Sequence, residues 1–146
     1  MPQAMATEIQ KQCETIEECY EFTLSFAARG LASDEGSELR AQLTRAVVAM
    51  RGLEQSCAEA IGEERLASAE KYQAFFAVLQ RDAESALAAM ELVLAQPVIG
   101  SQLIDNLNAS IHLRALLADL FLVTEILDEQ QKRARAEAAN GVIGPY

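Results

Sequence analysis

The stretch from Ser37 to Ile61, SELRAQLTRAVVAMRGLEQSCAEAI, decides the fold class. Its apolar residues recur at steps of four and three positions: Leu39, Leu43, Ala46, Met50, Leu53, Cys57 and Ile61. Residues at this spacing lie along one face of an α-helix, where they form a stripe that packs against neighbouring helices. The stretch therefore predicts an amphipathic helix over 37–61.

The next segment along the chain repeats the pattern. Its stripe consists of Tyr72, Phe76, Leu79, Ala83, Ala86, Met90 and Val93. A second apolar line through Phe75, Leu87 and Leu94 makes this helix apolar over much of its circumference. We therefore predict a helix over 64–95 that has more than one packing partner.

Two further helices complete the predicted architecture, one over 6–29 and one over 98–136. Gly30 follows the first of these, at the position where a left-handed residue commonly ends a helix. Ser33 and Asp34 are candidate caps for the next helix. Four helices of similar length with short links favour an all-α, antiparallel up-down four-helix bundle. We expect a single domain over 1–139 and a flexible C-terminal tail over 140–146.

Composition and charge restrict the function. The chain has 146 residues and a formal net charge of −10, which disfavours nucleic acid and anionic membranes as partners. We expect no membrane-spanning segment, because charged residues interrupt the apolar stretch around 113–127. With no signal peptide expected at the N-terminus and three cysteines (Cys13, Cys19 and Cys57), we predict a cytoplasmic protein with free thiols.

Few residues of the sequence form patterns typical of catalytic, phosphate-binding or metal-binding sites. His112 is the only histidine, so a di-iron bundle, which needs Glu-x-x-His on two helices, is excluded. No glycine-rich phosphate loop occurs. Glu14, Glu17, Glu18 and Glu21 share one helical face, which we interpret as a solvated acidic surface rather than a cation site. We predict no enzymatic activity, no cofactor and no metal.

Apolar residues on nearly every side of the last two helices exceed what a lone bundle can bury. We therefore predict a homo-oligomer, with an unknown protein as a further partner. The candidate interaction surface comprises Arg40, Arg45, Arg51, Phe75, Leu116 and Phe121.

Two segments carry a resemblance to a known family. Residues 42–50, QLTRAVVAM, and residues 71–87, KYQAFFAVLQRDAESAL, resemble motifs of a bacterial four-helix-bundle family of the 23S ribosomal RNA intervening-sequence type. That family is related to retroelement accessory proteins that bind a reverse transcriptase and nucleic acid. The resemblance implies a protomer of a ring-shaped homopentamer. It does not transfer the nucleic-acid activity, because this chain is acidic where that activity needs positive charge.

Three functions follow as hypotheses. The first is a non-enzymatic, self-associating bundle that acts as a scaffold or adaptor for another protein. The second, from the resemblance and the three arginines, is an accessory factor for RNA or a reverse transcriptase. The third is a bundle that holds an apolar small ligand between Phe75, Phe76 and Leu116.

Overall fold

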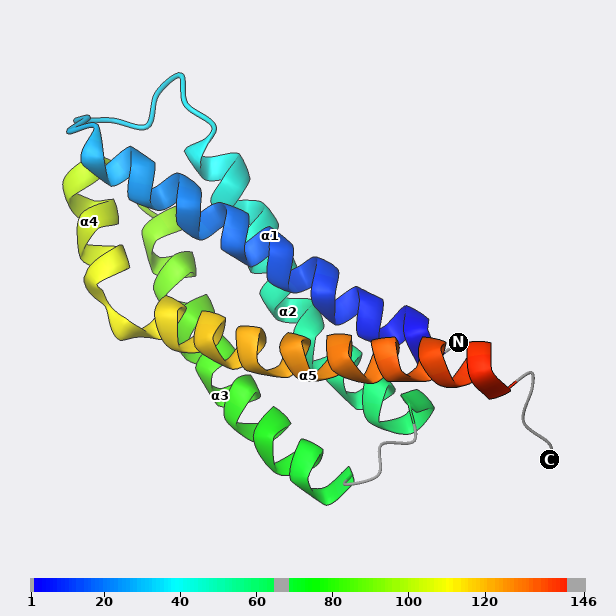
Figure 1. The fold of residues 1–146 in the computed structure, drawn as a ribbon. Coiled ribbons are helices and arrows are strands. Elements are labelled where there is room, and N and C mark those ends of the chain that lie inside the picture. Colours follow the sequence, from blue (N-terminus) through cyan, green and yellow to red (C-terminus); the bar gives the residue numbers. More distant parts are fainter. Residues whose placement is uncertain (1, 65–68, 142–146) are drawn as a thin grey trace.

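The computed structural model describes residues 2–64 and 69–141, and within these ranges it contains helices and no strand (Figure 1). The all-α fold class is therefore confirmed. The helices are α1 (Pro2–Ala28), α2 (Leu39–Glu64), α3 (Ala69–Leu94), α4 (Ser101–Ala109) and α5 (Ile111–Gly141).

The four long helices contact one another in a closed order. Helix α1 packs on α2, α2 on α3, α3 on α5, and α5 returns to α1. Consecutive long helices run in opposite directions in Figure 1. The short helix α4 packs chiefly against α1, near the end where the 29–38 loop and the 95–100 loop lie.

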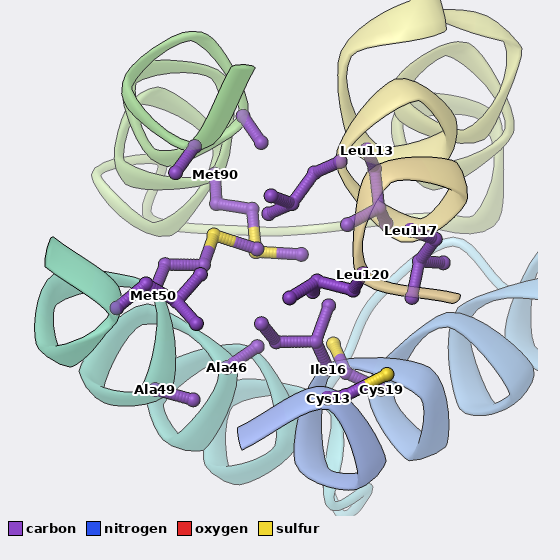
Figure 2. Packing of buried hydrophobic residues seen from close by; sticks show 14 of the residues in the cluster. Cys13, Ile16, Cys19, Ala46, Ala49, Met50, Met90, Leu113, Leu117 and Leu120 are labelled. Carbon is purple, nitrogen blue, oxygen red and sulfur yellow. The ribbon is translucent and has the colours of Figure 1, made fainter. Parts of the chain in front are cut away.

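The core is formed by the stripes that the sequence predicts. In α2, the stripe is buried from Leu39 to Cys57, and Ile61 is partly buried. In α3, it is buried from Phe76 to Val93, and Tyr72 is partly buried. Figure 2 shows the side chains of Met50 and Met90 reaching from α2 and α3 into the interior, where Leu120 of α5 and Ile16 of α1 also point.

The prediction of one helix over 98–136 is wrong, because the helix is interrupted at Ser110, which separates α4 from α5. This residue has an extended backbone with ψ 149°, and its hydroxyl group donates to the Leu107 carbonyl at 2.7 Å. Leu107 and Leu113 are both buried although they are six residues apart. Six residues turn a continuous helix by about 600°, which would place the two side chains about 120° apart. The break brings both of them to the interior and leaves Ile111 outside.

The turn after α1 follows the prediction in one respect and differs in another. Gly30 has a positive φ of 66°, as expected for a residue that ends a helix. The hydroxyl group that accepts the Leu39 N–H at the start of α2 belongs to Ser37, rather than to Ser33 or Asp34. Asp34 instead joins two loops: it accepts the Ile99 N–H at 2.9 Å and pairs with Arg40 at 2.7 Å.

The remaining predicted boundaries shift by a few residues. Helix α2 continues through Gly62 to Glu64, and α5 includes Asn140 and Gly141 of the predicted tail. The rest of that tail, 142–146, lies outside the described residues. Within the described part of the chain, no helix is both long enough and apolar enough to cross a membrane.

Candidate functional site

Helix α5 is apolar on two opposite faces. Its buried face packs against α1 and α3. Five apolar residues at steps of four, three, four and four lie on the opposite side, and we call them the outer face of α5: Ile111, Ala115, Ala118, Leu122 and Ile126. Ile111 is 67% exposed, Leu122 52% and Ile126 38%. A helix that packed only within this protomer would carry polar residues at these positions.

A groove runs between α1 and α5 on a neighbouring side. Two hollows of about 480 Å³ and about 410 Å³ form it, and Glu17 and Phe121 line both. Phe121 and Leu24 are each nearly half exposed. Tyr20 and Leu117 extend the apolar floor. We call this the α1–α5 groove.

The rim of the α1–α5 groove is acidic. Its carboxylates are Glu14, Glu17, Glu21 and Asp128, and its cations are Lys11 and Arg114. The side chains of Glu14, Glu21 and Asp128 are exposed, whereas Glu17 is half-buried. One end of the groove is bridged by Gln10, whose amide donates to Asp128 and, at 3.5 Å, to Gln131. Three of the four residues of the predicted acidic surface, Glu14, Glu17 and Glu21, therefore form part of one wall of an apolar groove.

Two carboxyl groups meet between α3 and α5. Burial, together with the neighbouring Asp82, raises the pKa of Asp119 to about 7. The Oδ2 atom of Asp119 is shielded from solvent and has no hydrogen-bond partner within residues 2–64 and 69–141. While it holds its proton, Asp119 can donate a hydrogen bond to Asp82. Below a pH of about 7, Asp119 therefore holds a proton, because burial and the adjacent carboxyl group of Asp82 both disfavour its charged form.

The three predicted arginines lie in different environments. Arg40 pairs with Asp34 and donates to the carbonyl groups of Leu94 and Gln96 at 3.1 and 2.7 Å. Arg51 pairs with Glu91 on α3. Arg45 lies on the other side of α2, in a shallow hollow against α1. The structure therefore does not bring these cations together as one anion-binding surface.

The three predicted apolar residues also have different environments. Phe121 is exposed in the α1–α5 groove. Phe75 is partly buried against the core. Leu116 is completely buried, so in this protomer it belongs to the interior and not to a surface.

The sequence pattern did not single out the other apolar residues of the groove. Leu24 and Tyr20 of α1 line the groove only because α1 packs beside α5. Leu122 and Ile126 had a signal in the sequence, because they are apolar residues on the side of α5 opposite its buried face. An apolar residue opposite a complete core stripe marks a second contact surface.

The three cysteines are free and buried in the core. Burial raises the pKa of Cys19 and of Cys57 to about 12. Burial, with Glu17 nearby, raises the pKa of Cys13 to about 11. Thiols with such pKa values remain protonated at neutral pH and are poor nucleophiles and metal ligands.

His112 is exposed at the start of α5. Across residues 2–64 and 69–141, no three His, Cys, Asp or Glu side chains are arranged to hold a metal ion. Comparison of the chain with protein-family models, curated proteins and solved structures gives no match.

Proposed function

We propose that the protein is a non-enzymatic scaffold or adaptor that self-associates through the outer face of α5. The observation that carries the proposal is the row of exposed apolar side chains at Ile111, Leu122 and Ile126, opposite the buried face of the same helix. Covering such side chains removes apolar surface from water and favours association. A second copy presents the same face, so the contact can be self-complementary.

The protomer in this proposal is an antiparallel up-down bundle of α1, α2, α3 and α5, with α4 as an added short helix. The closed order of contacts among the four long helices supports it. The family resemblance of residues 42–50 and 71–87 makes a ring of five copies the specific expectation for the assembly. Three buried free thiols suit a reducing compartment, so we propose the cytoplasm as the location.

The two other hypotheses have weaker support. An RNA-associated or reverse-transcriptase-associated role needs free cations, and Arg40 and Arg51 each pair with a carboxylate. An apolar ligand between Phe76 and Leu116 would need to displace core packing, because both side chains are buried.

The test compares the molar mass of the natural chain with that of Leu122→Glu/Ile126→Glu by light scattering after size exclusion. We expect the natural chain to be a multimer and the double variant to shift to monomer, because a buried glutamate without a partner strongly disfavours an interface. Both positions are solvent-exposed in the protomer, so the variant keeps its helical circular dichroism.

The matched control is Ala136→Glu/Ala138→Glu. It adds the same charge to the exposed, polar end of the same helix. This control should keep the mass of the natural chain. Equal masses for the natural chain and both variants would contradict the proposed interface.

A further inference from the structure

We propose that the α1–α5 groove binds a cationic amphipathic helix of another protein. The inference rests on the adaptor role proposed above, but it uses a surface that shares only Ala118 with the outer face of α5. It is carried by the shape of the groove, by its exposed apolar floor and by the charge of its rim.

The groove has the dimensions of a helix-binding site. Its lining runs from Gln10 to Leu24 on α1 and from Arg114 to Asp128 on α5. Each run rises about 21 Å, which corresponds to about four turns of a bound helix. The two walls are helices that pack on each other in the folded protomer, so the groove is present without a partner. An amphipathic helix binds such a groove with apolar residues spaced by three and four positions.

The floor offers sites for those apolar residues. Phe121 lies at the centre, where the two hollows meet, and Leu24 lies near one end. Tyr20 and Leu117 are between them in the second hollow. Exposed aromatic and aliphatic side chains in a concave surface are the usual anchors of protein interfaces.

The rim selects the charge of the partner. The rim contains four carboxylates and two cations, and the whole chain has a formal net charge of −10. The carboxylates of Glu14 and Glu21 are directed to solvent and are available to lysine or arginine residues that flank an apolar stripe. Complementary charge speeds encounter and rejects acidic helices.

A second copy of this chain does not fit the groove. Its one basic run, from Lys132 to Arg135, has alanine as its only apolar residue and is followed by Glu137. Such a segment has the required charge but cannot fill the floor. The chain's apolar helices in turn carry the same negative charge as the rim. The occupant is therefore a helix from a different, basic protein.

The test measures the fluorescence anisotropy of three labelled synthetic peptides of about 18 residues, a length that spans the groove with one extra turn. The first has a leucine stripe flanked by lysine, and the second has the same leucine positions flanked by glutamate. The third has the composition of the first with the leucine spacing scrambled. We expect saturable binding of the first peptide, and at least about tenfold weaker binding of the other two.

Matched variants locate the binding. Glu14→Gln/Glu17→Gln/Glu21→Gln should weaken binding of the lysine peptide about tenfold, because each exposed ion pair contributes modestly. Glu54→Gln/Glu59→Gln/Glu84→Gln removes three exposed carboxylates outside the groove and should change the affinity by less than about twofold. For the floor, Leu24→Gln should weaken binding, whereas Leu92→Gln, at a more exposed leucine on α3, should not.

The outcomes separate this inference from self-association. Equal binding of the lysine and glutamate peptides, or equal loss in the two triple variants, would overturn the groove as the site. Light scattering on the same samples reports the assembly independently, and the groove variants should keep the mass of the natural chain. If the natural chain is a monomer and binds the lysine peptide selectively, self-association is contradicted and the groove is supported as a binding site. If the natural chain is a multimer and does not bind the lysine peptide, the groove is contradicted as a binding site and self-association is supported.

Discussion

At the scale of single residues, folding places the carboxyl group of Asp119 beside that of Asp82 and raises its pKa to about 7. The ordinary value is 3.8, so between these pH values the folded protein holds a proton that the unfolded chain has released. The contribution of the pair to stability is therefore largest below about pH 4. It falls as the pH rises to about 7 and is level above that.

The change Asp119→Asn tests this pair. The amide is uncharged at every pH and can donate to Asp82, so the variant loses this part of the pH dependence. Above pH 7 it should be more stable than the natural chain by about 1–2 kcal/mol, a figure reduced for the partial exposure of the site. Urea unfolding at pH 5 and pH 8 measures the difference. Asp105→Asn, at an exposed carboxyl group of α4, is the control and should show no such trend.

The three buried thiols give a second prediction at this scale. With pKa values raised to about 11 and 12 by burial, Cys13, Cys19 and Cys57 should not react with Ellman's reagent at pH 8 in the folded protein. In guanidinium chloride all three should react. Rapid reaction of one thiol in the folded protein would contradict the burial described here.

At the scale of helices, the sequence was most informative where one stripe persists. The steps of four and three from Leu39 to Cys57 and from Phe76 to Val93 predicted α2 and α3, because a buried helical face leaves that periodicity in the sequence. The break at Ser110 was missed because apolar residues continue on both sides of it. The step of two from Ile111 to Leu113 was its only signal.

The α1–α5 groove was not predictable in the same way. Phe121 was predicted as part of the candidate interaction surface. Its partners Leu24 and Tyr20 are about 100 residues away in the chain and are brought near it only by the packing of α1 on α5. The acidic residues of α1 were correctly placed on one face. Their role as a groove wall depends on which helix lies beside that face, and helical periodicity carries no information about that.

A prediction at the helix scale concerns the attachment of α4. The Ser101 hydroxyl group donates to the Phe26 carbonyl at 2.6 Å and accepts the Leu31 N–H at 2.8 Å. Ser101→Ala removes both bonds in a buried site and should lower the free energy of unfolding by about 2 kcal/mol. The midpoint of urea unfolding measures it. Ser85→Ala, at an exposed position of α3, is the control, and an equal effect of both changes would contradict the role of Ser101.

At the scale of the whole molecule, two apolar surfaces lie side by side on one helix and differ in charge. The outer face of α5 is a row of aliphatic residues, whereas the α1–α5 groove has an acidic rim. The net charge of −10 disfavours close approach of copies except where apolar contact outweighs the repulsion. Salt should therefore strengthen self-association and weaken binding of a cationic helix.

The native mass of the intact assembly tests self-association most directly. Native mass spectrometry should give a multiple of the 15.9 kDa chain, and about 80 kDa for the ring of five copies that the family resemblance implies. Leu122→Glu/Ile126→Glu should give the single-chain mass. A single species of 15.9 kDa for the natural chain, at concentrations where its fold is intact, would contradict the proposal that the outer face of α5 is an interface between copies.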